Sequence, residues 1–321
     1  MRIVAALGGN ALIRRGEPRT VQTQRDNLVA AALALAPLAR EHQLVITHGN
    51  GPQVGLLALQ AAAYATKDAS AATPLDVLGA ESEGMVGYLI EQALANVMPE
   101  RRVATLLTQI EVHADDPAFK APSKPIGPLY SAEQVVRLRQ ATHWLFARDG
   151  THWRRVLPSP RPQRVLELGV IQWLLEQGVT VICGGGGGIP VQQRDGLYFG
   201  IEAVIDKDNA SGLLARQLDA DLMLLLTDVP GVAMDFGAAT AQWLRRQTPA
   251  SLAALNLPAG SMGPKVQAAA EFVQASGKRA AIGRLEDAIA LARGEAGTQV
   301  TPDGDTDAIE APSQGRRAIE P

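Results

Sequence analysis

Cysteine is nearly absent from this sequence, because Cys183 is the only one in 321 residues, and an internal disulfide is therefore excluded. Aromatic residues make up only 4%, while alanine, leucine and glycine are abundant, which suits helices packed closely on a sheet. No apolar run approaches the roughly 18 residues of a membrane span. The start, MRIVAALGGN, has too short an apolar stretch for a signal peptide. The net charge of −3 gives no excess of positive charge for nucleic acid. We therefore expect a cytoplasmic protein with about two domains, or one large one.

A lysine stands at the start of a predicted helix in the stretch 201–218, IEAVIDKDNASGLLARQL. Asp206 and Asp208 are residue types that cap helices, and apolar residues then recur at helical spacing. The first turn of a helix favours anions, so Lys207 is unusual there unless it helps the helix start to bind something strongly negative, such as a phosphate. The alternative is a solvated surface lysine, and this stretch alone does not separate the two.

Glycine-rich turns follow predicted strands. The apolar run 3–7 ends in Gly-Gly-Asn (8–10), and the run 44–47 ends in His-Gly-Asn-Gly-Pro (48–52), with a predicted helix over 21–40 between them. This pattern indicates a βαβ unit, and α/β proteins bind ligands at the carboxyl ends of such strands. Glycine lets backbone N–H groups approach an anion closely, although most turns of this kind are only turns. A histidine packed beside a turn is more often structural, so we assign no catalytic role to His48.

Five glycines, residues 184–188, follow directly after the predicted strand 179–183. They do not form a Walker loop, because no Gly-Lys-Ser/Thr follows, and they are no Rossmann fingerprint, because Ile189-Pro190 does not open a helix. We expect them to offer backbone N–H groups free of side chains. The stretch VQQRDGLYFG, which separates them from the Lys207 helix, is predicted as a hairpin. The run 102–112 is predicted as one further strand.

Residues 113–162 differ from the rest, since they are rich in proline, carry scattered charges and show no steady periodicity around a short predicted helix over 132–141. A segment of this length is usually a functional lid or a subdomain. Lys124 lies in its stiffest part, between Pro122 and Pro125.

A second lysine is predicted in the first turn of a helix near the end of the chain. After the strand 222–227, a loosely structured region leads to PAGSMGPK, where Pro264 suits the first helical position and Lys265 follows it. Glycine amides with several lysines can neutralise and align a transferring phosphoryl group. No residues have the spacing of metal ligands, and no G-x-S-x-G motif is present. The residues alone predict a mostly parallel sheet with helices on both faces, and an ATP-dependent kinase for a small anionic acceptor.

In chain order, the strand ending in GGN, THGNGPQVG, AVIDKD, LLTDV and GSMGPK resemble the motifs of the amino-acid kinase superfamily, and within it those of the carbamate kinases, over residues 1–302. Many superfamily members carry a lysine just before the first glycine pair, where this chain has Ala6 and Leu7. Carbamate kinases lack it too and carry a lysine in the proline-rich insert, which here reads SKPIGP with Lys124. The family's bulky residue at the position of Gly263 and its aromatic after the TDV loop are missing, so the adenine pocket is expected to differ.

The resemblance implies a three-layer αβα sandwich with a mostly parallel open sheet of about eight strands and a small proline-rich protruding subdomain. It implies an amino-acid-kinase domain over 1–303, with an acceptor half over 1–178 that contains the lid insert 113–162, and a nucleotide half over 179–303. The tail 304–321 is polar and charged, and we expect it to be disordered.

The reaction that the resemblance implies is reversible phosphoryl transfer between ATP and carbamate, giving ADP and carbamoyl phosphate and often run toward ATP. It implies a homodimer, with Mg²⁺ bound through the nucleotide phosphates and not by protein side chains. The alternatives are a kinase for another small carboxylate, such as an acetylglutamate-type acceptor, and a catalytically silent small-anion sensor, against which the intact lysines argue. The implied catalytic residues are Lys207, Lys265, Lys124 and Asp208; the residues for carbamate and the phosphoryl group are Gly8, Gly9, Asn10, Asn50 and Gly51; and those for the nucleotide are Thr227, Asp228, Met262 and Lys265.

Overall fold

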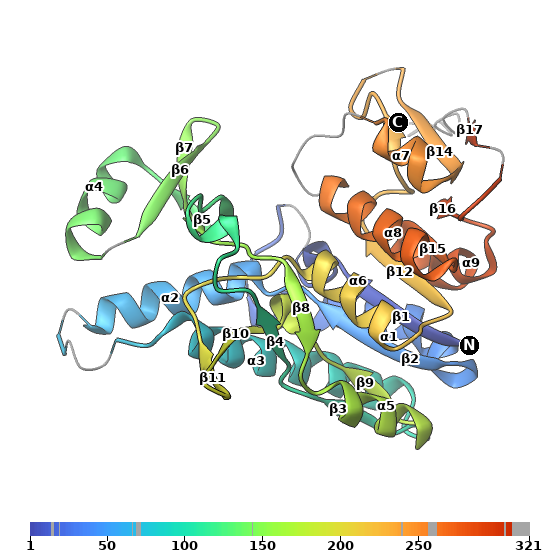
Figure 1. The fold of residues 1–321 in the computed structure, drawn as a ribbon, viewed down its shortest axis with the longest axis horizontal. Helices are drawn as coiled ribbons and strands as arrows, with labels where there is room; N and C mark the ends of the chain where they lie inside the picture. The colour runs from blue at the N-terminus through green and yellow to red at the C-terminus, as the bar shows by residue number, and fades with distance from the viewer. Residues whose placement is uncertain are drawn as a thin grey trace, which may run out of the picture.

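The computed structural model of this chain describes residues 1–13, 16–18, 20–65, 67–68, 72–142, 144–238, 240–255, 262–304 and 306–309 (Figure 1). Its centre is a large sheet, whose strands are β1 (Arg2–Leu7), β2 (Gln43–His48), β3 (Val103–Thr105), β9 (Thr180–Ile182), β12 (Leu222–Thr227), β13 (Ala233–Met234), β14 (Gln242–Gln247), β15 (Arg279–Arg284), β16 (Thr298–Val300) and β17 (Asp307–Ile309). They run in the order β13-β14-β16-β15-β12-β1-β2-β9-β3, with β17 beside β14.

The middle of this sheet is parallel and buried on both faces. Every neighbouring pair from β15 across to β3 is parallel. Because both faces are covered, these strands read as continuous apolar runs. In β1, Val4 and Ala6 belong to one core, whereas Ile3, Ala5 and Leu7 belong to the core on the opposite face.

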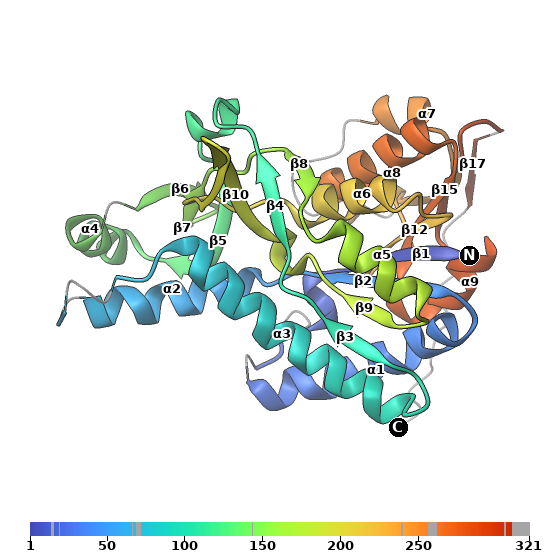
Figure 2. The ribbon, with the colours of Figure 1, turned by 60° about the horizontal axis from the view of Figure 1, so that its bottom comes forward.

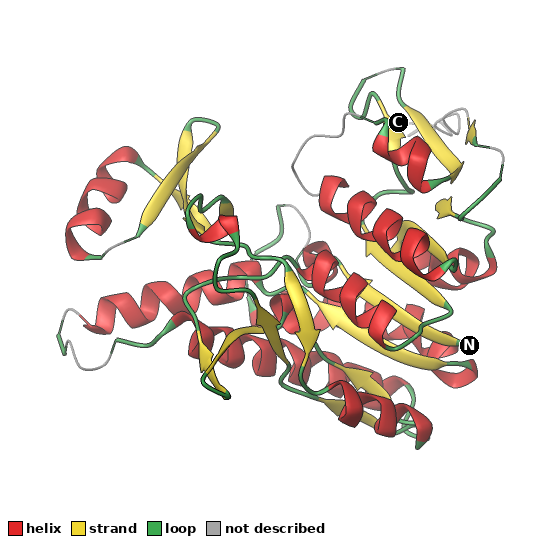
Figure 3. Cartoon of the chain, viewed as in Figure 1, coloured by secondary structure: helices red, strands yellow, loops and turns green. Residues whose placement is uncertain are grey.

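Helices cover both faces of the sheet, as Figures 2 and 3 show. One core takes its helical residues from α1 (Val21–Glu41), α3 (Leu75–Val97) and α9 (Ala288–Arg293). The other takes most of its helical residues from α5 (Leu168–Glu176), α6 (Lys207–Gln217) and α8 (Met262–Ser276). The predicted αβα architecture with a mostly parallel sheet is therefore confirmed, although within the described residues the sheet has 10 strands instead of about eight. None of the helices in the described ranges is long and apolar enough to cross a membrane.

A second sheet, in the order β11-β10-β4-β8, lies beside the first. It consists of β4 (Gln109–Val112), β8 (Pro162–Val165), β10 (Ile189–Arg194) and β11 (Leu197–Gly200), which confirms the hairpin predicted in VQQRDGLYFG. The single strand predicted over 102–112 is wrong. Its first part, β3, pairs with β9 in the large sheet, whereas its second part, β4, pairs with β10 in the second sheet. Leu106 N still donates to Ile182 O, while Thr108 O already accepts from Ile189 N. Both halves are extended, so periodicity does not reveal the change of sheet.

The proline-rich insert forms a small protruding unit at the upper left of Figure 1. A three-stranded sheet, β5-β7-β6, is accompanied by a helix that matches the predicted one. A Cβ on Gly55 would lie 2.1 Å from Gly127 Cα, so the insert packs directly on the helix that carries Gly55. Ile126 and Val54 share an apolar cluster at this contact. The elements named here are α2 (Gly51–Ala65), β5 (Lys124–Tyr130), α4 (Ala132–Ala141), β6 (Leu145–Asp149) and β7 (His152–Leu157).

The region after residue 231, expected to be loosely structured, contains β13, β14 and the short helix α7 (Pro249–Ala253). That expectation was wrong because β14, QWLRRQ, has only Leu244 and Gln247 buried and so lacks an apolar run. Residues 307–309 pair antiparallel with β14 through main-chain bonds that need no apolar side chain, and the expected disorder of the tail 304–321 stays a prediction. Residues 305 and 310–321 lie outside the described part of the chain.

Candidate active site

Lys207 is the first residue of α6, and Asp206 caps that helix. Oδ1 of Asp206 accepts hydrogen bonds from the backbone N of Asp208 at 2.9 Å and of Asn209 at 3.3 Å. Lys207 therefore lies in the first turn of a helix, as predicted. Its aliphatic stem passes the second glycine turn, since a Cβ on Gly49 would lie 3.5 Å from Lys207 Cδ.

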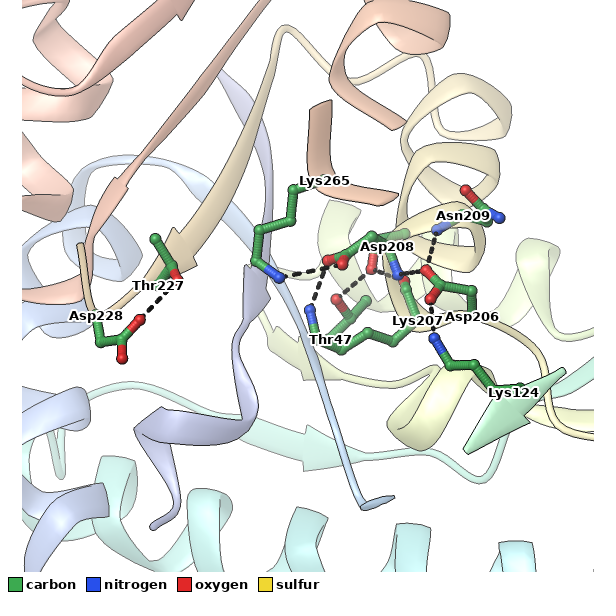
Figure 4. A network of polar contacts seen from close by, with 10 residues as sticks. Thr47, Lys124, Asp206, Lys207, Asp208, Asn209, Thr227, Asp228 and Lys265 are labelled. Atoms are coloured by element: carbon green, nitrogen blue, oxygen red, sulfur yellow. Dashed lines mark hydrogen bonds and ion pairs between the residues drawn. The ribbon is translucent and has the colours of Figure 1, made fainter. Parts of the chain in front are cut away.

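Asp208 lies between two lysines (Figure 4). Its Oδ1 accepts from Lys207 Nζ at 2.5 Å and its Oδ2 from Lys265 Nζ at 3.2 Å. Asp208 is only 3% exposed. Burial alone would raise the pKa of its carboxyl, but the ammonium groups of Lys207 and Lys265 outweigh burial and hold that pKa below its usual value. The carboxylate stays charged and fixes the positions of both ammonium groups.

Lys265 lies in the first turn of α8. This helix begins at Met262, slightly before its predicted start at Pro264. Burial and the charge of Lys207 lower the pKa of Lys265, while the Asp208 carboxylate opposes that shift. Lys265 is therefore a buried cation whose charge depends on its acidic partner.

Lys124 reaches the same helix start from the insert. Its Nζ forms an ion pair with Oδ2 of Asp206, the cap of α6. Its side chain is 35% exposed, against 10% for that of Asp206. The structure thus brings together lysines from β5, α6 and α8, which are far apart in sequence (Figure 4).

The first glycine turn lies beside Lys207 and next to β12. A Cβ on Gly8 would be 2.9 Å from Leu226 O, to which Gly8 N donates. Gly9 opens the short helix η1 (Gly9–Ala11), and a Cβ there would have nothing within 4 Å. A Cβ on Gly49 would lie 3.8 Å from Gly9 Cα, so the two glycine turns meet. The side chain of Asn10 lies outside the described part of the structure.

Asn50 directly precedes α2, which begins at Gly51. Its backbone O accepts from the N of Gln53 and of Val54, and its Nδ2 donates to Ser82 Oγ of α3 at 2.7 Å. Asn50 is buried, at 8% exposure, so this bond fixes its side chain. Its role in binding substrate stays a prediction, as does that of Gly51.

The five-glycine loop is packed within the protein and does not offer a row of unused N–H groups, contrary to expectation. Gly184 N donates to Thr108 Oγ1 and Gly185 N to Glu83 Oε1. The N–H groups of Gly187 and Gly188 donate to backbone oxygens within the loop. The glycines are needed for close approach: a Cβ on Gly186 would lie 2.2 Å from Asn50 Nδ2, and one on Gly187 would lie 2.1 Å from Ile205 O.

The predicted nucleotide residues lie at the other end of the lysine cluster. Thr227 Oγ1 donates to Asp228 Oδ1 at 3.2 Å, and Figure 4 shows this pair beyond Lys265, on the side away from Asp208. Both line a cavity of about 460 Å³. Met262 packs against the core between the sheet and α8, whereas the Gly260-Ser261 part of the motif lies outside the described residues. Their roles in nucleotide binding stay predictions.

Sequence reasoning missed Thr47 and Ser211. Thr47 Oγ1 donates to Ser211 Oγ at 2.6 Å, and Ser211 Oγ donates to the backbone O of Lys207 at 2.6 Å. These bonds tie the end of β2 to the first turn of α6. The only signal in the sequence is that Ser211 stands four residues after Lys207, on the same helix face.

Acidic, histidine and cysteine side chains form no group of three or more that could hold a metal ion within the ranges that the structure describes. The central carboxylate, Asp208, is engaged by Lys207 and Lys265. The two ammonium groups beside Asp208 suit an anion.

Comparisons with known proteins identify the family of this chain. The Amino acid kinase family matches residues 1–284. The carbamate kinase of Rhizobium meliloti is 52% identical over 305 residues, which cover 94% of this chain and 93% of the relative. That of Haemophilus influenzae is 51% identical, covering 94% and 97%. A solved structure, the carbamate kinase from Giardia lamblia bound to AMP-PNP, has a TM-score of 0.86 at 39% identity and covers 94% of this chain and 98% of that one. The chain therefore belongs to the amino acid kinase family and, within it, to the carbamate kinases.

Proposed function

We propose that this protein is an ATP:carbamate phosphotransferase, which moves a phosphoryl group reversibly between ATP and carbamate. The observation that carries the proposal is the convergence of Lys124, Lys207 and Lys265 beside the open space at Gly9. Such a cluster suits phosphoryl transfer, where the protein must neutralise and align the transferring group. Identities of 51% and 52% to carbamate kinases favour carbamate as the acceptor over an acetylglutamate-type carboxylate.

In the direction of ATP formation, a β-phosphate oxygen of ADP attacks the phosphorus of carbamoyl phosphate. The bond from phosphorus to the carbamate oxygen breaks, and carbamate leaves with the electron pair, so the protein needs to supply no proton. Lys207 and Lys265 neutralise the charge on the transferring group. Asp208 holds both ammonium groups in place, at 2.5 and 3.2 Å, and acts by positioning them.

Helix starts add to the positive potential of the site. α2 begins at Gly51, α6 at Lys207 and α8 at Met262, each next to a residue of the proposed site. The exposed N–H groups and partial positive charge of a helix N-terminus favour a phosphate. A lysine in the first turn of a helix is unfavourable when no anion is bound, because it adds positive charge to a positive helix end. It becomes favourable when the protein binds a polyanion there.

We propose that the nucleotide substrate is the magnesium complex of ATP or ADP. The carboxylate at the centre of the site is occupied by lysines. Mg²⁺ retains waters and binds readily through substrate phosphates and few protein groups. The ion would neutralise phosphate charge as it arrives with the nucleotide.

A coupled assay tests the function. Purified protein is mixed with ADP, Mg²⁺ and carbamoyl phosphate, and ATP formation is followed through hexokinase and glucose-6-phosphate dehydrogenase. The reverse reaction is measured as ADP release from ATP with carbamate or with N-acetylglutamate. We expect ATP from carbamoyl phosphate and no turnover of N-acetylglutamate. Turnover of N-acetylglutamate alone would identify the other acceptor, and no turnover of either would indicate an anion sensor.

Replacement of Lys124 by alanine is expected to lower kcat/KM for carbamoyl phosphate at least about 10-fold, or about 1.4 kcal/mol. The insert carries this charge to the site, and Asp206 keeps its bonds to the α6 backbone without it, so the fold should survive. ADP affinity should change little. The matched control is Lys120→Ala, which removes an exposed lysine from the same insert. Normal turnover by the Lys124→Ala protein would show that the insert lysine takes no part.

We also propose that the protein acts as a homodimer, as its resemblance to the carbamate kinases implies. Apolar side chains are exposed on the neighbouring helices α1 and α3, where Arg25 lies over the ring of Tyr88. Leu33 is 59% exposed and Tyr88 52%. A second copy that covered them would explain their exposure. Sedimentation equilibrium should give twice the 33.9 kDa chain mass, and Leu33→Glu should shift it toward one chain; a monomeric wild-type protein would contradict the proposal.

A further inference from the structure

Glu83 of α3 lies buried beneath the five-glycine loop, with no exposed surface. Its Oε1 accepts from Gly185 N at 2.8 Å and its Oε2 from Thr108 N at 3.3 Å. A Cβ on Gly185 would lie only 2.8 Å from Glu83 Cγ, so the loop packs directly on this side chain. Glu83 therefore connects α3 to the loop and to the crossover between β3 and β4.

His48 flanks Gly185 as well. A Cβ on Gly185 would be 2.6 Å from His48 Nε2, so both side chains converge on this glycine. His48 Nδ1 is 3.1 Å from Gly49 O, and since a carbonyl only accepts, Nδ1 carries the hydrogen. Nε2 is then a buried acceptor, and it has no partner among the described residues. Burial lowers the pKa of His48 to about 4, so the ring is neutral.

These contacts lead to the proposed anion site through the second glycine turn. The next loop residue, Gly186, packs on Asn50, whose Nδ2 donates to Ser82, the neighbour of Glu83. Gly49, whose carbonyl accepts from His48, lies against the stem of Lys207 and against Gly9. The carboxyl group of Glu83 therefore holds the five-glycine loop against one side of the turn 48–51. The substrate is proposed to bind on the opposite side of that turn.

The surroundings of Glu83 disfavour a negative charge. Burial raises the pKa of Glu83 to about 8, although the N–H groups of Gly185 and Thr108 act in the opposite direction. The titratable groups that face it are the neutral ring of His48, the buried thiol of Cys183, whose pKa burial also raises, and Glu167 at the start of α5, which repels a second carboxylate. Of the site cations, Lys207 acts on the neighbouring ring of His48. Within the described residues no lysine or arginine forms an ion pair with Glu83.

We propose that Glu83 is a positioning residue that acts as an uncharged acid: it holds the five-glycine loop against the turn 48–51, and its ionisation in alkaline solution weakens the binding of carbamoyl phosphate. This inference rests on the proposed function. A neutral carboxylic acid has one O–H donor and keeps acceptor capacity on its oxygens, whereas a glutamine amide has one acceptor oxygen, which suits the shorter bond from Gly185 N, and no proton that ionises. An ionised Glu83 would instead place an uncompensated buried charge under a site for anions, where the low dielectric strengthens repulsion.

The matched test is Glu83→Gln, which keeps the size of the side chain and an acceptor for Gly185 N, gives up the longer bond from Thr108 N at 3.3 Å, and removes the ionisation. Near pH 7 its kcat and KM should lie within about threefold of the wild type. At pH 9 a group with a pKa of about 8 is roughly nine-tenths ionised, so the wild-type KM for carbamoyl phosphate should exceed that of the variant about tenfold. The KM for ADP and kcat should show no such difference. Glu81→Gln, at an exposed position of α3, is the control and should follow the wild type.

A second readout needs no turnover. The pKa of Glu83 rises from 4.5 in the unfolded chain to about 8 in the fold. Its contribution to stability is then fully present below 4.5 and is lost as the pH rises to about 8. The melting temperature of the wild type, relative to that of Glu83→Gln, should therefore fall between pH 5 and 8 and level off above that range.

The two readouts separate failure of the inference from failure of the function. Parallel KM profiles for the wild type and Glu83→Gln would overturn the role of ionisation, as would a folded variant that is inactive at pH 7. If neither protein forms ATP at any pH, the proposed function fails, and the melting curves still decide whether Glu83 is uncharged in the fold. If Glu83→Gln does not fold, the wild-type KM for carbamoyl phosphate alone must rise about tenfold from pH 7 to 9 against a steady KM for ADP.

Discussion

Replacement of Lys207 by alanine is expected to lower kcat for ATP formation by about 10²- to 10³-fold, the range for losing one preorganised group that stabilises a transition state. Lys207 Nζ is held by Asp208 at 2.5 Å, and its side chain is only 14% exposed, so the charge is in place before the reaction begins. The KM for ADP should change much less, because this charge is expected to act on the group in transfer. Initial rates in the coupled assay measure both quantities.

The fold should tolerate this change. Asp206, the cap of α6, keeps its bonds to the backbone N of Asp208 and Asn209, and Asp208 keeps its bond to Lys265. Lys207→Met is the matched variant, because it retains a stem to pack against Gly49 and removes only the charge. It should lose as much kcat as the alanine variant, at a melting temperature close to that of the wild type. A Lys207→Met protein with wild-type turnover would show that the lysine has no catalytic role.

The local features of the fold could be predicted because the residues that determine them are neighbours in sequence. The start of α6 follows from Asp206 and from the apolar spacing behind it, and β12 coincides with the predicted run 222–227. Lys207 and Lys265 were identified for the same reason, since each contradicts the charge preference of the helix end on which it stands. Sequence spacing gave no distance between them, which Asp208 sets in the folded chain.

The features that could not be predicted depend on contacts between distant parts of the chain. Gly185 and Glu83 are 102 positions apart, and no local pattern indicates that a carboxyl group will hold the five-glycine loop. Free N–H groups were predicted for this loop because a glycine in a sequence indicates only that a side chain would not fit. It does not indicate which group packs against the backbone there. In the same way, β14 lies near the edge of the sheet and buries few side chains, so its residues carry no apolar period.

Replacement of Gly9 by valine is expected to abolish measurable ATP formation, which means a loss beyond the 10³-fold upper range for a single transition-state donor. A Cβ on Gly9 would meet nothing within 4 Å, and Gly9 is not among the glycines with positive φ, so the protein itself can accept a side chain there. The methyl groups of valine would occupy the open space beside Gly49 and Lys207, where a substrate is proposed to approach the backbone. Turnover is measured in the coupled assay, and folding by circular dichroism and thermal melting.

The neighbouring glycine supplies a contrast that tests the reason for this loss. A Cβ on Gly8 would lie 2.9 Å from Leu226 O, inside the contact between β1 and β12, so Gly8→Val should lower the melting temperature whether or not a substrate is present. Gly9→Val should melt like the wild type and be inactive. If Gly9→Val were unfolded, the glycine would serve the structure and its inactivity would say nothing about binding. If it folded and still formed ATP, the open space at Gly9 would not be where carbamoyl phosphate binds, and the lysine cluster would have to receive its substrate from another side.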